Sequence, residues 1–137
     1  MYELEVQGEF AAAHAILLNG TREPLHGHNW HVKVTLAGKD LDKEQLLCDF
    51  HEVERALRAL IADWHNRNLN DCPPFADKDG KPGLNPTAEA IARTISDQLS
   101  SRLGPVLKGR ARLASVRVTE APGCAATYRS FLPMTSG

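Results

Sequence analysis

The stretch HNWHVKVTL, residues His28–Leu36, alternates apolar and polar side chains with the period of two that is typical of a half-buried β-strand. Residues 1–16 begin with the same alternation, with apolar side chains at the even positions from 2 to 6. The loop LNGTREP, residues 18–24, separates the two segments and is rich in turn-forming residues. These features predict two neighbouring strands that can pair as a hairpin.

Two amphipathic helices are predicted after these strands. Asp49 is placed to cap the first helix, with a glutamate three residues on, and apolar side chains then recur at helical spacing until about Asp63. For the second helix, Asn85 is the expected cap and Pro86 the expected first residue, and apolar positions continue to Leu103. Each helix therefore has an apolar face that must pack against another element.

The rest of the chain supplies a short extended piece at Leu46–Leu47, a long loop over residues 66–85, and two further strands. These strands are Arg112–Glu120 and Ala125–Leu132, joined by the turn-forming sequence Ala-Pro-Gly. Long loops inside compact domains are often functional. The order ββααββ predicts one α+β domain over residues 1–137, with an antiparallel sheet covered on one face.

The composition excludes several classes of partner. Because 16 lysine and arginine residues face 17 aspartate and glutamate residues, the net charge is -1 and does not attract nucleic acid or an anionic membrane. No apolar run is long enough to span a bilayer, and the start MYELEVQGEF is charged where a signal peptide would be apolar. We therefore expect a cytoplasmic protein. The three cysteines lack C-x-x-C spacing and are expected to be free thiols.

Histidines near the predicted hairpin could form a metal site. Residues two apart on a strand share a face, so His26 and His28 would lie side by side, and His14 would join them if the two strands pair in the right register. Three imidazoles with an open fourth position form a catalytic zinc site. An H-x-H pair alone is equally compatible with hydrogen-bonded structural histidines. The other three histidines are treated as ordinary residues: His31, His51 and His65.

Several motifs, in order along nearly the whole chain, resemble the 6-pyruvoyltetrahydropterin synthase and 6-carboxytetrahydropterin synthase family. They are FAAAH at residues 10–14, LHGHN at 25–29, NPTAE at 85–89, VTE at 118–120, and Tyr128-Arg129. The resemblance implies the tunnelling fold, a four-stranded antiparallel sheet backed by two helices. In that fold, subunits join edge to edge and close a barrel, as a trimer or a dimer of trimers, with active sites between subunits.

The resemblance also implies roles for individual residues. Zinc would bind His14, His26 and His28, and Glu120 would hold a pterin by accepting hydrogen bonds from its ring N–H and amino group. Thr87 lies in a segment that lines the same pocket. Without the resemblance, Glu120 would be interpreted as a solvated carboxylate at a strand end and Thr87 as a hydroxyl in the first turn of a helix.

The chain departs from the synthase pattern at the proton-transfer groups. The family's cysteine base corresponds to Arg22, which cannot accept a proton at neutral pH. The family also has an Asp-His pair. When the alignment is anchored on Leu69–Asn70, His65 stands at the position of its aspartate. A shift of one residue makes His65 the histidine but leaves Trp64 at the aspartate. Asp63 could substitute, although a surface carboxylate at a helix end is an equally good interpretation.

Glu23 suggests a different reaction. It stands three residues before His26 in an E-x-x-H-G-H pattern that resembles a branch of the family with aldolase activity, which cleaves dihydroneopterin-type side chains. We therefore expect lyase-type chemistry on the C6 side chain of a dihydropterin, with Glu23 as base and His65 as a second candidate. Glu23 could instead be a solvated loop acid, a partner of Arg22, or a support for a zinc-bound histidine.

Two other functions stay open. The chain could be a catalytically inactive homologue that binds a pterin or a purine and has lost the proton-transfer groups. Alternatively, zinc-bound water could hydrolyse another heterocycle, which would need only the metal and a pocket.

Overall fold

Strands β1 (Tyr2–His14) and β4 (His26–Gly38) pair antiparallel along their whole length in the computed structural model, which describes residues 1–130. This confirms the predicted hairpin. The second strand begins two residues earlier than expected, so His26 lies on the strand. The register places His14 directly opposite His26.

The main sheet has five strands, in the order β5-β1-β4-β6-β7. Strands β6 (Arg112–Ala121) and β7 (Cys124–Arg129) extend it antiparallel from β4, as predicted. The expected four-stranded sheet is wrong because the two-residue strand β5 (Arg67–Asn68) adds a parallel edge beside β1. An outer strand leaves backbone donors and acceptors without partners, and the chain returning from the first helix satisfies some of them on β1.

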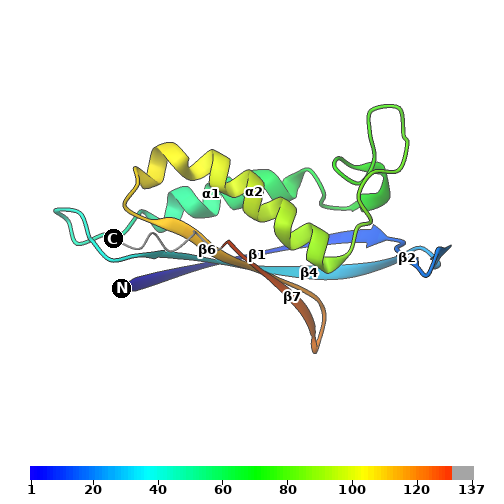
Figure 1. Cartoon of the computed structure of the whole chain (residues 1–137), viewed down its shortest axis with the longest axis horizontal. Coiled ribbons are helices and arrows are strands. Elements are labelled where there is room, and N and C mark those ends of the chain that lie inside the picture. The colour runs from blue at the N-terminus through cyan, green and yellow to red at the C-terminus, as the bar shows by residue number, and fades with distance from the viewer. Residues whose placement is uncertain (131–137) are drawn as a thin grey trace.

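Helices α1 (Phe50–Ala62) and α2 (Ala88–Leu107) cover one face of this sheet (Figure 1). Asp49 caps α1 as predicted, since its side chain accepts a hydrogen bond from the backbone N–H two residues on. Helix α2 is capped by Thr87 rather than by Asn85. The Asn85 amide is unavailable as a cap because it binds the backbone N–H and C=O of Leu17.

The core lies between the helices and the sheet, where β1 and β4 point alternate side chains inward. The Phe10 and Trp30 rings stack with centroids 6.0 Å apart, and Trp64 packs against Phe10 at 5.7 Å. Burial of these aromatic and aliphatic groups supplies most of the folding free energy. The largest fully buried side chains are Trp30, Phe10, Leu36, Leu47, Leu57, Leu60, Leu69, Ile91, Ile95, Leu99, Leu103 and His14.

Two predicted segments differ from the structure. Leu46–Leu47 forms no strand, because Leu47 anchors an irregular turn by burying its side chain in the core. The long loop is interrupted by β5 and by the 3-10 helix η1 (Leu69–Asp71). The last strand ends at Arg129, and the final part of its predicted range, residues 131–132, lies outside the described residues.

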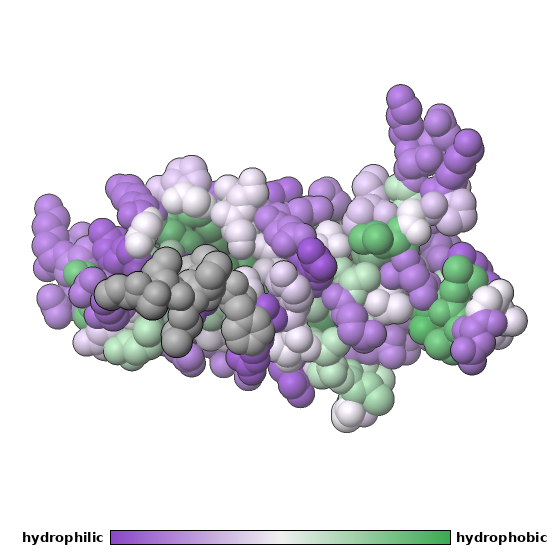
Figure 2. Space-filling model, viewed as in Figure 1, coloured by the Kyte–Doolittle hydropathy of each residue, from purple (hydrophilic) through white to green (hydrophobic). Residues whose placement is uncertain are grey.

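A small hairpin closes the end of the molecule that carries the histidines. Strands β2 (Leu17–Leu18) and β3 (Thr21–Arg22) pair around Asn19 and Gly20, both with positive φ, which suits a tight two-residue turn. Apolar side chains gather on the surface at this hairpin (Figure 2). Within the described residues, no helix has both the length and the apolar character required to cross a membrane.

Candidate active site

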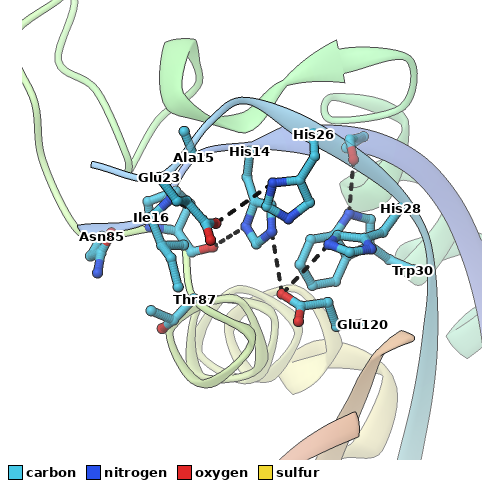
Figure 3. Close-up of polar contacts among 12 residues, drawn as sticks. His14, Ala15, Ile16, Glu23, His26, His28, Trp30, Asn85, Thr87 and Glu120 are labelled. Carbon is cyan, nitrogen blue, oxygen red and sulfur yellow. Dashed lines mark hydrogen bonds and ion pairs between the residues drawn. The ribbon is translucent and has the colours of Figure 1, made fainter. Parts of the chain in front are cut away.

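Three imidazoles converge at the ends of β1 and β4. His14 faces His26 across the strand pair, and His28 lies two residues further along the same face of β4. Their ring centroids are 4.7–5.1 Å apart, and one ring nitrogen from each lies within 4.8 Å of the others. Figure 3 shows the three rings turned toward one another. The predicted histidine cluster therefore forms, and its spacing suits a single metal ion.

Backbone carbonyls orient two of these rings. The Nδ1 atom of His14 lies 2.8 Å from the Pro86 oxygen, and that of His26 lies 2.9 Å from the Pro24 oxygen. A carbonyl can only accept, so both Nδ1 atoms carry the proton. The neutral ring then has its free lone pair on Nε2, which is the arrangement that carbonyl partners impose on metal-binding histidines.

The buried nitrogens of the cluster fit a metal. The Nε2 atoms of His14 and His28 are buried and have no hydrogen-bond partner among the described residues. Buried polar atoms without a partner are rare, because the lost hydration costs free energy. Burial also lowers the pKa of His28, which favours the neutral form that binds a metal. The donor set and its orphaned lone pairs therefore match a zinc ion.

Trp30 packs beneath the cluster. Its ring lies edge-on to His14 at 4.9 Å and to His28 at 5.2 Å, and it is fully buried. The indole Nε1–H donates to the Ala12 carbonyl at 3.1 Å, which fixes the ring. A rigid aromatic floor limits the rotation of both imidazoles, so the cluster is preorganised.

Glu120, near the end of β6, brings a carboxylate to the same point. Its Oε1 lies 3.2 Å from Nε2 of His14 and 3.9 Å from Nε2 of His28, as the dashed lines in Figure 3 mark. The side chain is 30% exposed, so one side of it remains open to a ligand. The structure thus joins a residue from the far end of the sequence to the histidines.

Glu23 lies on the other side of His26. Its Oε1 accepts a hydrogen bond from the Ile16 N–H at 3.2 Å and is 3.7 Å from Nδ1 of His26, too far for a hydrogen bond. Since Pro24 already supports His26, Glu23 is not needed for that role. Within residues 1–130 no ion pair joins Glu23 to Arg22, whose guanidinium donates instead to the Ala15 oxygen at 2.6 Å.

Two asparagines hold the segment between His14 and Glu23. The Asn70 amide accepts from the Ala15 N–H at 2.8 Å and donates to the Ala15 oxygen at 2.9 Å. The Asn85 amide does the same for Leu17, at 2.9 Å and 3.1 Å. Each asparagine side chain therefore satisfies the backbone N–H and C=O of one residue, as a neighbouring strand would. This role was not predicted from the sequence, although Asn85 stands in the NPTAE motif and Asn70 in the Leu69–Asn70 step used to align the family's Asp-His pair.

The remaining predicted residues lie at the margin of the cluster. Thr87 accepts the Ala90 N–H at 3.1 Å as the α2 cap, and it also lines a hollow of about 570 Å³ together with Arg93 and Tyr128. His65 is exposed at the edge of β1, where its Nδ1 accepts the Ala11 N–H at 3.1 Å. The structure does not bring His65 into the histidine cluster of this chain.

Two of the three cysteines are unsuited to replace the family's cysteine base, whose position Arg22 occupies. Cys48 and Cys72 are buried, and burial raises the pKa of both thiols, which disfavours the thiolate form. Cys124, the first residue of β7, is exposed. The acidic groups that contact the histidine cluster are the carboxylates of Glu23 and Glu120.

Comparison with known proteins agrees with this arrangement. Residues 3–130 match the family model described as 6-pyruvoyl tetrahydropterin synthase. The chain is 30% identical over 130 residues to the 6-carboxy-5,6,7,8-tetrahydropterin synthase of Bacillus subtilis, covering 93% of this chain and 85% of that protein. It is 29% identical over 119 residues to the enzyme of the same name from Aquifex aeolicus, covering 77% and 74%.

Solved structures share the fold. The 6-pyruvoyl tetrahydropterin synthase of Plasmodium vivax superimposes with a TM-score of 0.78 at 24% identity, covering 96% of this chain and 98% of that one. The Caenorhabditis elegans enzyme gives 0.75 at 20% identity, covering 95% and 96%. A further Plasmodium vivax structure is of a variant whose catalytic glutamate is replaced by alanine.

Proposed function

The chain belongs to the 6-pyruvoyl tetrahydropterin synthase family, and on this premise we propose that it is a zinc-dependent pterin enzyme with lyase-type chemistry. Its substrate would be a dihydropterin, dihydroneopterin or its phosphate, and the C6 side chain would be cleaved. One observation carries the proposal: the histidine cluster has buried, orphaned nitrogens and is flanked by a carboxylate, Glu23, where the usual cysteine base is missing.

His14, His26 and His28 would hold the metal. Zinc bound there would polarise a side-chain hydroxyl of the substrate and lower its pKa. The Pro86 and Pro24 carbonyls keep the His14 and His26 rings in the tautomer that presents Nε2, and Trp30 restricts ring rotation. These contacts support a site whose ligands need little reorganisation.

Glu23 would accept the hydroxyl proton. As the O–H bond breaks, the oxygen forms a carbonyl, the adjacent C–C bond breaks, and its electron pair passes to the carbon attached to the pterin ring. That carbon is then protonated, so proton and electron counts balance. The hydrogen bond from the Ile16 N–H holds one oxygen of Glu23, which leaves the other for this transfer. The catalytic glutamate named for the Plasmodium vivax enzyme supports a carboxylate base in this family.

Glu120 and Thr87 would bind the pterin ring. The Glu120 carboxylate is partly exposed beside the cluster, and a carboxylate can accept two parallel hydrogen bonds from a ring N–H and an amino group. Thr87 lines the neighbouring hollow, and its hydroxyl can still donate while it caps α2. His65 would act only if another subunit brought a site to the exposed edge of β1.

We further propose that subunits join edge to edge, with sites between them. In the described part of the chain, β7 pairs only with β6, and β5 covers only residues 12–13 of β1. Such open edges favour pairing with another strand, and a trimer or a dimer of trimers would close them.

A non-catalytic pterin binder is the second candidate. One observation favours it. The residues at the positions of the family's cysteine base and Asp-His pair bind backbone groups of this chain instead. Arg22 binds the Ala15 carbonyl, and His65 binds the Ala11 N–H. In this function Glu120 keeps its role and Glu23 has none.

Two measurements test the proposal. Elemental mass spectrometry of tag-free protein grown with zinc should find about one zinc per chain, and His28→Ala should lose it. Cleavage of dihydroneopterin should fall at least about 100-fold in Glu23→Gln with binding retained, which is the usual size of a general-base effect. Glu9→Gln is the matched control, because Glu9 also faces a histidine, His31 at 3.6 Å, but is far more exposed.

The possible results separate the candidates. Folded protein that stays metal-free in zinc-containing medium refutes the lyase mechanism. Tight pterin binding without cleavage by the wild type identifies the binder. Unchanged cleavage by Glu23→Gln refutes the assignment of Glu23 as base.

A further inference from the structure

We propose that Glu120 is a fourth ligand of the metal when no pterin is bound, and that a pterin opens this position by drawing the carboxylate away. This inference rests on the proposed function, because it assigns regulation to the same site. It concerns a single carboxylate that must serve two partners in turn.

The geometry around Glu120 is that of a coordination shell. In a tetrahedral zinc site with metal–ligand bonds of about 2.0–2.1 Å, neighbouring ligand atoms lie about 3.3 Å apart. Oε1 of Glu120 lies 3.2 Å from Nε2 of His14 and 3.9 Å from Nε2 of His28. One carboxylate oxygen is therefore placed at ligand–ligand distance from His14 and somewhat beyond that distance from His28.

A simple ion pair with His14 accounts for these contacts less well. Nδ1 of His14 already carries a proton for the Pro86 carbonyl, so a proton on Nε2 would create a cation on a fully buried ring. Moreover, Nε2 of His14 has no hydrogen-bond partner even though Oε1 is 3.2 Å away. The two atoms are therefore within hydrogen-bond distance without forming a hydrogen bond. A cation between the two atoms would satisfy both.

Glu120 also has no competing partner within residues 1–130. No lysine or arginine there forms an ion pair with it, and the contacts of its carboxylate are to His14 and His28. A partly buried carboxylate beside two lone pairs is electrostatically unfavourable unless a cation is present.

The two roles of Glu120 exclude each other. Holding a pterin edge through a ring N–H and an amino group uses both carboxylate oxygens, so the carboxylate must turn from the metal to the ring. Binding of the pterin ring and binding of the metal should therefore oppose each other, and linkage requires the effect to be equal in both directions. The fourth position would open only when substrate is present.

Metal affinity, measured without turnover, tests this inference. Zinc affinity is determined by competition with a chromophoric chelator, and Co²⁺ absorption reports the ligand set. We expect Glu120→Gln to weaken zinc binding at least about tenfold and to change the Co²⁺ spectrum, whereas Glu9→Gln leaves both unchanged. Circular dichroism checks that each variant is folded.

Unsubstituted pterin is the second probe, because it lacks the C6 side chain and can reach the site without a hydroxyl to offer the metal. We expect it to weaken zinc binding by the wild type and to alter the Co²⁺ spectrum. Zinc should weaken pterin binding by the same factor.

Each outcome decides a separate point. Equal zinc affinity in Glu120→Gln and Glu9→Gln overturns the fourth ligand, and so does a pterin that binds the wild type without affecting the metal. If pterin does not bind the wild type at all, the proposed function fails, while the comparison of the two variants still decides whether Glu120 binds the metal.

Discussion

Replacing Asn70 with alanine should destabilise the protein and weaken metal binding, because Asn70 holds the residue that follows His14. The substitution removes two hydrogen bonds to Ala15, at 2.8 Å and 2.9 Å. Ala15 is buried, with 6% of its surface exposed, so water cannot readily replace the lost partner. The cost therefore depends on what each backbone group retains.

The two backbone groups of Ala15 lose different amounts. The Ala15 oxygen keeps the Arg22 guanidinium at 2.6 Å and loses one hydrogen bond, a net cost of about 0.5–1.5 kcal/mol. The Ala15 N–H loses its acceptor and remains buried, which costs about 1–3 kcal/mol. Together these give about 1.5–4.5 kcal/mol, a large part of the 5–15 kcal/mol typical of a folded domain.

Asn85→Ala is the matched comparison. It removes the same pair of bonds from Leu17, whose surface is 43% exposed, so water replaces the amide and the expected cost is about 1 kcal/mol. Urea unfolding of the metal-free proteins, all at one protomer concentration, measures both losses of stability. The slope of the free energy of unfolding against urea concentration should stay unchanged. An Asn70→Ala protein within 0.5 kcal/mol of wild type, or one no less stable than Asn85→Ala, would refute the reasoning.

Three further predictions follow from single features. Gly83→Ala should lower the free energy of unfolding by about 1–3 kcal/mol, because the added Cβ would overlap the Pro74 carbonyl oxygen. Urea unfolding measures the loss, and a variant as stable as the wild type would contradict the close approach of Gly83 to Pro74. Co²⁺ should quench the fluorescence of a Trp64→Phe protein, because the remaining Trp30 contacts His14 and His28, and adding His28→Ala should abolish the quenching. A thiol reagent should modify the exposed Cys124 quickly and the buried Cys48 and Cys72 only after denaturation, so rapid reaction of a second thiol in the native protein would contradict their burial.

Much of the site was predictable because it depends on local periodicity. Strand alternation alone places His26 and His28 on one face, and the structure confirms this with ring centroids 4.7 Å apart. The same alternation predicts the inward-facing Trp30. The family was also correctly inferred, because its motifs are short and retain their order along the chain.

The position of His14 required the tertiary structure. A register shifted by one residue would turn its side chain to the opposite face, and the sequence does not specify which register the long hairpin adopts. Pairing of His14 with His26 follows from burial of one face of both strands against the helices. Strand β5 depends in the same way on an open edge that only the assembled sheet presents.

The sequence by itself therefore determined the four long strands, the two helices, the paired histidines of β4 and the family, since each depends on residue spacing within a short segment. Only the tertiary structure decided that Glu120 meets His14, that Asn70 and Asn85 hold the backbone beside it, and that Thr87 caps α2 in place of Asn85. The two asparagine side chains bind backbone 55 and 68 residues away. Such contacts arise from packing of the whole chain, which no local pattern of residues encodes.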